Sequence, residues 1–340
     1  MRRLAAPGVL LALAAALAPL AWGAAPPHSW AQAQIDTVVR AGVMGTDAQS
    51  FRPDDPLTQN DLGDLIGTLT GQPVAAGFTA RPVTIASLDR QLVDALGLGP
   101  TAQQFAQSAR AAGLRVPARF GTELVARLLG LRVNHPAKQD ALELLPGDTA
   151  TRAEAAYSAA RILSFSGDEA KRVETAAGSF GLPAFTAWQA RILTSALSFV
   201  GFPYVWGGTS EKRQTVLAVT SRGGFDCSGF VWRVYKLQAY PNEGALGAVL
   251  KGRTTMQMSG EVPAAQRIAL DAIQPGDVLF FGSKGAKSKP AQIDHTGIYV
   301  GAGWFVHSSE SGVALSQLDG WYLDRLAWAR RPLAEAGLSA

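Results

Sequence analysis

The sequence predicts an α+β domain at residues 186–335, preceded by an all-α region. Apolar residues recur at helical spacing through the first half of the chain, whereas short β-like runs separated by glycines follow after about residue 200. The chain has 340 residues, of which 47% are hydrophobic and 17% charged. This composition can bury a substantial core, excludes a disordered protein and suggests two or three domains.

The N-terminus has the pattern of a secretory signal peptide at residues 1–23. Two arginines precede an apolar run rich in Ala and Leu, and small residues follow it where a signal peptidase cleaves. The run is short for a membrane span, and we expect no transmembrane segment after cleavage. We therefore expect a secreted protein. An uncleaved anchor is the alternative.

Residues 24–72 predict a helix, a loop and a second helix. Ile35, Val38 and Val39 share one helical face, glycines at 42 and 45 end the first helix, and Thr58 can cap the second. Trp30 together with residues 42–45 (GVMG) and 51–58 (FRPDDPLT) resembles an S-layer homology (SLH) repeat.

A second, degenerate SLH-like repeat ends the helical region at 73–166. Its ending is residues 145–154 (LPGDTATRAE). In that family the module holds secreted proteins to wall polymers, and the resemblance implies polymer-binding roles for Trp30 and Arg152. Gln59 stands where the first copy would carry the corresponding arginine. Helical packing without a ligand is the alternative.

Residues 167–185 combine Ser, Gly, charged residues and Pro183, which predicts a linker into the next domain. After it, residues 188–200 have helical spacing. The β-like runs are 277–281, 295–300 and 304–307.

Cys227 is the only cysteine, so no intramolecular disulfide can form. Asp226 can cap a helix that begins at Cys227, because Phe230, Val231 and Val234 follow at helical intervals. A thiol in the first turn of a helix is favoured as thiolate by the helix dipole, so we expect a lowered pKa and a nucleophile at neutral pH.

A thiolate nucleophile needs an imidazole partner, and only His295 and His307 lie in the same domain. They flank a glycine-rich turn, so the segment predicts a β-hairpin. If the turn is centred on Gly301, the two histidines are equidistant from it and directly opposite each other. One could accept the thiol proton while the other fixes its tautomer, and geometry alone allows either assignment.

The cysteine and the two histidines also allow two alternatives to a catalytic site. They could form a zinc site, although a fourth ligand and the usual close ligand spacing are missing. The histidines could also merely satisfy hydrogen bonds on a half-buried hairpin. Tyr204 is a candidate donor to an oxyanion, together with the Cys227 N–H, or a plain core tyrosine.

The second half of the chain resembles the NlpC/P60 family of cysteine peptidases over about residues 186–333. The segments that carry the resemblance are, in order, 203–208 (PYVWGG), 226–230 (DCSGF), 253–257 (RTTMQ), 275–281 (PGDVLFF), 295–299 (HTGIY) and 305–309 (FVHSS). It implies a papain-like core with Cys227 as nucleophile, His295 as base and His307 as the residue that orients the base. Tyr204 corresponds to the oxyanion tyrosine and Ser228 to a residue that receives substrate polar groups.

The implied reaction is hydrolysis of an amide in peptidoglycan stem peptides, commonly between γ-D-glutamyl and a diamino acid, without metal or other cofactor. The expected partners are stem peptides and an anionic secondary cell-wall polymer, with a cell-wall location and no nucleic acid. Two alternatives remain: a non-catalytic wall-binding protein with a degenerate peptidase domain, and an acyl or peptidyl transferase that uses the same thioester chemistry.

Overall fold

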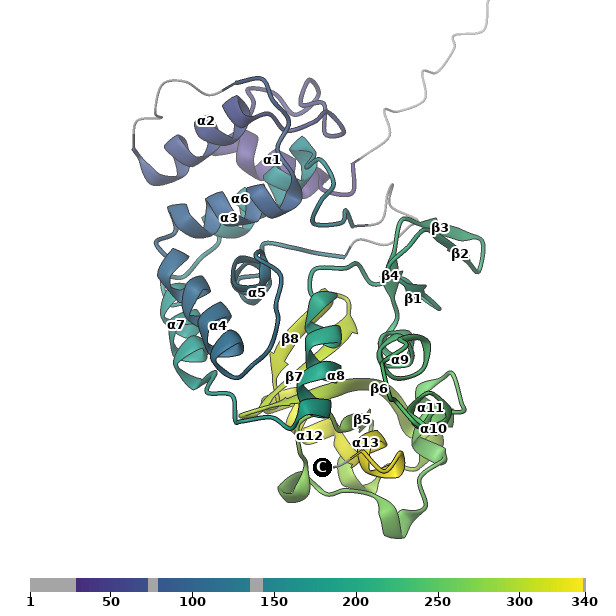
Figure 1. Cartoon of the computed structure of the whole chain (residues 1–340). Helices are drawn as coiled ribbons and strands as arrows, with labels where there is room; N and C mark the ends of the chain where they lie inside the picture. The colour runs from purple at the N-terminus through teal and green to yellow at the C-terminus, as the bar shows by residue number, and fades with distance from the viewer. Residues whose placement is uncertain (1–28, 73–78, 135–142, 339–340) are drawn as a thin grey trace, which may run out of the picture.

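The computed structural model describes residues 29–72, 79–134 and 143–338, so the signal-peptide prediction at 1–23 lies outside the described residues. Helices α1–α7 form one region and the five-stranded sheet with its covering helices forms the other (Figure 1). Within the described segments, no helix is long and apolar enough to cross a membrane. An all-α region followed by an α+β domain is therefore confirmed.

The helical region contains seven helices in its described part: α1 (Gln32–Arg40), α2 (Gln59–Thr70), α3 (Ile85–Ala95), α4 (Gly99–Ala111), α5 (Phe120–Leu128), α6 (Arg152–Leu163) and α7 (Glu169–Ser179). The helix–loop–helix predicted for 24–72 is α1 and α2. Thr58 caps α2 as expected, because its side chain accepts the backbone N–H of Asp61 while the Asp61 carboxylate accepts the N–H of Thr58.

Three cap segments meet at one place in this region. Thr58, Thr84 and Thr151 each cap a helix through the side-chain hydroxyl. The segments that carry them also pair in a cycle through isolated bridges, Pro56 with Thr151, Thr58 with Pro82 and Thr84 with Thr149. The cycle reveals a third repeat-like unit, centred on Thr84, between the two that the sequence indicates.

The linker expected at 167–185 is helical over most of its length and needs correction. Helix α7 packs on α4 and buries Val173, Ala176 and Ala177, which recur at helical spacing. Phe180, which directly follows the helix, contacts Phe105 edge to face, with ring centroids 5.3 Å apart. Residues 181–186, without helix or strand, form the remaining connection.

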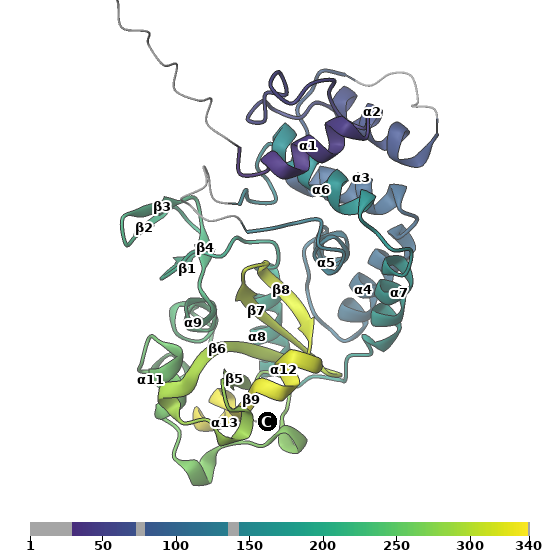
Figure 2. The same ribbon diagram turned by 180° about the vertical axis from the view of Figure 1, so that it is seen from behind.

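The C-terminal domain is built on an antiparallel sheet with strand order β8-β7-β6-β5-β9. The strands are β5 (Val278–Gly282), β6 (Ile293–Gly301), β7 (Trp304–Ser309), β8 (Gly312–Gln317) and β9 (Leu326–Arg330). Helices α8 (Ala187–Ser198) and α9 (Cys227–Trp232) lie on one face, and α12 (Gly320–Arg325) lies on the other (Figure 2). The α9 helix continues into a π-helical turn, Arg233–Leu237.

The remaining elements are short and lie around this sheet. They are α10 (Leu246–Val249), α11 (Thr255–Gly260), α13 (Pro332–Glu335) and the two-stranded pairs β1 (Thr209–Ser210) with β4 (Gly224–Phe225) and β2 (Gln214–Val216) with β3 (Val219–Ser221).

The two regions share one hydrophobic core. Trp304 of β7 is fully buried and meets Phe105 of α4 and Phe180 edge to face, at centroid distances of 5.9 and 5.3 Å. Buried residues of α3–α7 and of the sheet belong to the same contiguous apolar cluster. The helical region is therefore packed against the sheet rather than tethered to it.

Candidate active site

Cys227 is the first residue of α9, as the sequence predicts. Asp226 caps the helix, because its side chain accepts the backbone N–H of Gly229. The cysteine is 9% exposed. Its sulfur faces the backbone N–H groups of Ser228 and of Thr296, the residue that follows His295 in β6.

The expected lowering of the thiol pKa is wrong for this structure. Burial, with a smaller contribution from the Asp226 carboxylate, raises the pKa of Cys227 to about 12. The N–H groups of Ser228 and Thr296 and the charge of Arg253 act in the opposite direction but do not compensate. At neutral pH the resting cysteine is therefore a thiol.

His295 and His307 meet in the hairpin of β6 and β7. The Nε2 atom of His295 lies 2.8 Å from Nδ1 of His307, and the rings are nearly perpendicular. Burial lowers the pKa of His295 to about 4, and burial together with His295 lowers the pKa of His307 well below its usual value. Both rings are therefore neutral at pH 7.

The predicted register of this hairpin is wrong by two residues, although the contact between the histidines is right. The turn consists of Ala302 and Gly303, both with positive φ, and a bulge precedes it. Ile298 pairs with Val306, which brings Gly297 rather than His295 next to His307. The two histidines are diagonal neighbours on one face, still within reach of each other.

Backbone pairing between β6 and β7 begins at Ile298 and runs toward the turn. On the other side of Ile298, the N–H of Thr296 points to the Cys227 sulfur. The start of α9 therefore meets the sheet where β6 and β7 separate, beside His295.

Two residues that the sequence patterns did not single out continue the histidine pair. His307 Nε2 lies 2.9 Å from the Ser316 hydroxyl on β8. The Tyr322 hydroxyl is hydrogen-bonded to Ser316 and Ser309, and its ring lies 5.2 Å from that of His307. If the Ser316 hydroxyl accepts a hydrogen bond from the Nε2–H of His307, then His307 Nδ1 accepts a hydrogen bond from the Nε2–H of His295. The Nδ1 atom of His295 then carries no proton.

Tyr204 is beside the segment that leads to the nucleophile. It forms a parallel bridge with Phe225, and Val205 donates its N–H to the Phe225 carbonyl at 3.1 Å. Burial raises the pKa of the Tyr204 phenol, and the negative charge that Cys227 would carry as a thiolate and the charge of Asp226 raise it further, so its hydroxyl stays protonated.

Ser228 belongs to a network that fixes the helix start. Its hydroxyl accepts a hydrogen bond from Arg253 at 2.7 Å and donates to Asp226 at 3.1 Å. Arg253 also pairs with the Asp226 carboxylate at 3.1 Å and donates to the Gly207 carbonyl. This arginine comes from the segment 253–257 (RTTMQ). Its role in fixing the start of α9 could not be predicted from its position in the sequence.

Each of the two residues considered for polymer binding contacts the other SLH-like repeat, Trp30 from the first repeat and Arg152 from the second. Trp30 packs against Tyr157 of α6, with ring centroids 5.8 Å apart. Arg152 pairs with Asp61 at 3.0 Å, donates to the Phe51 carbonyl and lies over the Phe51 ring. Its side chain is only 15% exposed, and its positive charge is paired with Asp61 within the protein.

The zinc alternative has no support in the described part of the chain. No group of three His, Cys, Asp or Glu side chains is placed there to hold a metal ion. His295 and His307 instead direct a ring nitrogen at each other.

Comparison with known proteins matches two parts of the chain. Residues 201–331 match the model of the NlpC/P60 family, and residues 25–61 match the S-layer homology domain. The chain is 32% identical over 127 residues to the gamma-D-glutamyl-L-lysine dipeptidyl-peptidase of Bacillus subtilis, covering 37% of this chain and 34% of that protein. It is 34% identical over 131 residues to the probable peptidoglycan endopeptidase LytE of the same species, covering 38% and 30%.

A solved NlpC/P60 family protein from Bacillus cereus is 25% identical, with 45% of this chain and 41% of that chain covered and a TM-score of 0.32. The chain spans about a third of the length of the two Bacillus subtilis relatives. The matched residues include the cysteine at the start of α9 and both histidines of the hairpin. Residues 201–331 of this chain are thus identified by their match to the NlpC/P60 family, and residues 25–61, N-terminal to them, by their match to the S-layer homology domain.

Proposed function

We propose that this protein is a secreted, wall-associated cysteine peptidase that hydrolyses an amide bond in peptidoglycan stem peptides. The bond between γ-D-glutamyl and a diamino acid is the proposed site of cleavage. One relative is named for action on gamma-D-glutamyl-L-lysine and another as a probable peptidoglycan endopeptidase, which supports this class of substrate. The SLH match at 25–61 supports a cell-wall location.

The observation that carries the proposal is the contact between the Cys227 thiol and the segment of β6 that carries His295. Cys227 contacts the N–H of Thr296, and the adjacent His295 is held by His307 at 2.8 Å. A nucleophile, a base and a group that orients the base are the three parts that thiol-dependent acyl transfer requires.

The first chemical step follows from the protonation states. The thiol is neutral, and so is the imidazole of His295. As Cys227 Sγ attacks the scissile carbonyl, its proton passes to His295 Nδ1, and the resulting charge is shared with His307. Tyr204 and the Cys227 N–H stabilise the oxyanion, since N–H groups in the first turn of a helix have no acceptor within the helix.

The second half of the reaction returns the enzyme to its resting state. His295 gives its proton to the leaving amine as the C–N bond breaks, and a thioester remains on Cys227. His295 then takes a proton from water, whose oxygen attacks the thioester. The C–S bond breaks to release the acid, and the proton returns to the sulfur.

Mass spectrometry of stem peptides and purified peptidoglycan tests the proposal. The wild type, Cys227→Ala and the control Asn60→Ala, which alters an exposed residue of α2, are incubated with substrates of several wall chemistries. We expect new stem fragments with the wild type and the control only. Fragments from Cys227→Ala would exclude the thiol mechanism, and none from the wild type would favour a wall-binding protein. Products joined to an added amine would instead indicate a transferase.

A further inference from the structure

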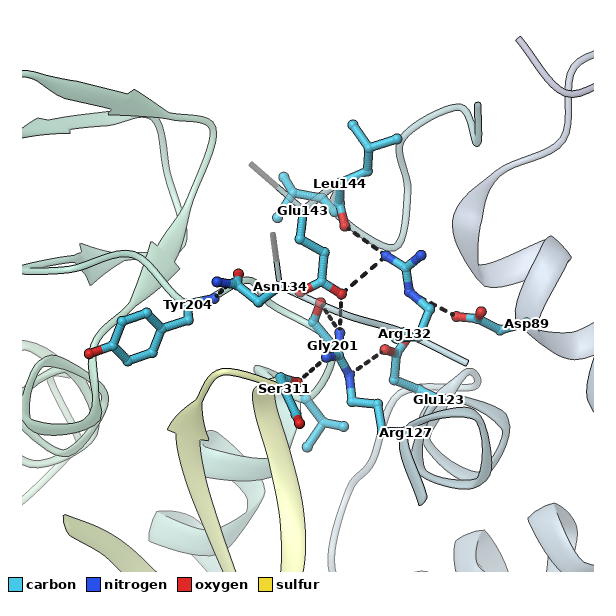
Figure 3. A network of polar contacts seen from close by, with 12 residues as sticks. Asp89, Glu123, Arg127, Arg132, Asn134, Glu143, Leu144, Gly201, Tyr204 and Ser311 are labelled. Carbon is cyan, nitrogen blue, oxygen red and sulfur yellow. Dashed lines mark hydrogen bonds and ion pairs between the residues drawn. The ribbon is translucent and has the colours of Figure 1, made fainter. Parts of the chain in front are cut away.

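One arginine of the helical region reaches into the C-terminal domain. Arg127 of α5 has a buried side chain, and it donates to the carbonyl of Ser311 in the β7–β8 turn and to that of Gly201 at 3.2 Å (Figure 3). These two segments are also joined to each other, because the Gly201 N–H donates to the Val313 carbonyl at 2.9 Å. Gly201 belongs to the loop that leads directly to Tyr204.

An ion cluster holds Arg127 in this position. Its guanidinium pairs with Glu123 at 2.8 Å and with Glu143 at 2.9 Å. Glu143 also pairs with Arg132 at 3.1 Å, and Arg132 pairs with Glu154 of α6 at 2.6 Å. All of these side chains are at most 2% exposed, so α5, α6 and the two residues Arg132 and Glu143 are fixed relative to one another.

Asn134, two residues after Arg132 in the chain, joins the helical region to the segment that carries Tyr204. Its side-chain Oδ1 accepts the backbone N–H of Tyr204 at 2.8 Å, and its own backbone N–H donates to the Glu310 carbonyl at 3.1 Å. Figure 3 shows Asn134 between the ion cluster and Tyr204, with the tyrosine ring on the side away from the cluster. The bridge to Phe225 holds Tyr204 from the other direction.

We propose that Asn134 is a positioning residue for Tyr204, and that the helical region thereby completes the catalytic site. The role of Tyr204 as an oxyanion donor rests on the proposed function. The contact orients the backbone of a residue whose side chain must reach the developing oxyanion within a few tenths of an ångström. Without Asn134, the N–H of Tyr204 loses its acceptor and the loop 201–206 gains freedom to move.

Two measurements on the full chain test this proposal. The first is hydrogen exchange of the peptide covering 202–206 in Asn134→Ala, Asn134→Asp and the control Asn60→Ala. The second is the rate of stem-peptide hydrolysis by the same proteins. Aspartate keeps an acceptor oxygen at the same place, whereas alanine removes it.

We expect faster exchange at 202–206 only in Asn134→Ala, with kcat lowered about tenfold and KM within about twofold of the wild type. Asn134→Asp should restore both. Unchanged exchange at 202–206 in Asn134→Ala would show that the hydrogen bond from Tyr204 to Asn134 does not hold this loop, which would overturn the proposal. Faster exchange with an unchanged kcat would overturn the positioning role of Asn134. An inactive wild type would overturn the peptidase proposal, and hydrogen exchange would still decide the contact.

Discussion

Acidification should destabilise the fold through the buried histidine pair. In the unfolded chain His295 takes up a proton near pH 6.5, whereas burial lowers its pKa in the folded protein to about 4. Between these values the unfolded state binds more protons, so the free energy of unfolding falls as the pH decreases. The shifted pKa of His295 alone should lower the free energy of unfolding by about 2.5 kcal/mol between pH 7 and pH 4.5. His307 acts in the same direction.

Urea unfolding of the wild type and of His295→Gln, followed by tryptophan fluorescence at pH 7 and pH 4.5, measures this effect. Glutamine can still hydrogen-bond to His307 but does not titrate. Burial raises the pKa of Asp89 and Glu143, which stabilises the fold at low pH, and these groups are present in both proteins. On acidification from pH 7 to pH 4.5, the free energy of unfolding of the wild type should fall by about 2 kcal/mol more than that of His295→Gln. Equal losses would refute the buried, neutral state of His295.

Three further predictions concern the reaction. The rate of Cys227 alkylation by iodoacetamide should rise about tenfold per pH unit from pH 7 to 10, because the thiol pKa is about 12; a rate that levels off below pH 9 would contradict this. Tyr204→Phe should lower kcat about 100-fold with little change in the free energy of unfolding, because the variant lacks only the hydroxyl that donates to the oxyanion. An unchanged kcat would show that Tyr204 is not the oxyanion donor. Ser316→Ala should lower kcat about tenfold and Ser316→Thr should restore it, because the hydroxyl selects the tautomer of His307; equal rates in all three proteins would exclude that role.

Local sequence signals predicted the helices whose ends they specify. Thr58 and Asp226 each cap a helix, and in each case the cap precedes an apolar pattern of helical period. Helix α7 was missed because its sequence is rich in charged and small residues, and its stability comes from packing Val173 and Phe180 against α4 and the sheet. Tertiary contacts of that kind leave only a weak pattern in the sequence.

Some features of the candidate site could likewise be predicted from local sequence, whereas others depend on tertiary contacts. Cys227, His295 and His307 were identified because the residue types and the hairpin signal restrict their arrangement. The register was misjudged by two residues because the turn lies at Ala302 and Gly303 rather than at Gly301, and the bulge before Ala302 offsets only part of that shift. Asn134 lies 70 residues before Tyr204 in the chain, and nothing in its neighbouring sequence signals that contact. The raised thiol pKa was missed because burial, which outweighs the helix N-terminus, depends on the whole fold.

The packing of the helical region limits how the segment that matches the S-layer homology domain can move relative to the C-terminal domain. A wall anchor on a flexible linker would let the peptidase search a wide area around its attachment point. Here Trp304 joins a core with Phe105, and Arg127 reaches two carbonyls of the C-terminal domain from a buried ion cluster. Removing one partner from such a cluster costs about 3–5 kcal/mol, because the remaining charge stays buried. The orientation of the candidate site relative to the first helical repeat is therefore fixed, and under the proposed function attachment through that repeat would determine which stem peptides the site can reach.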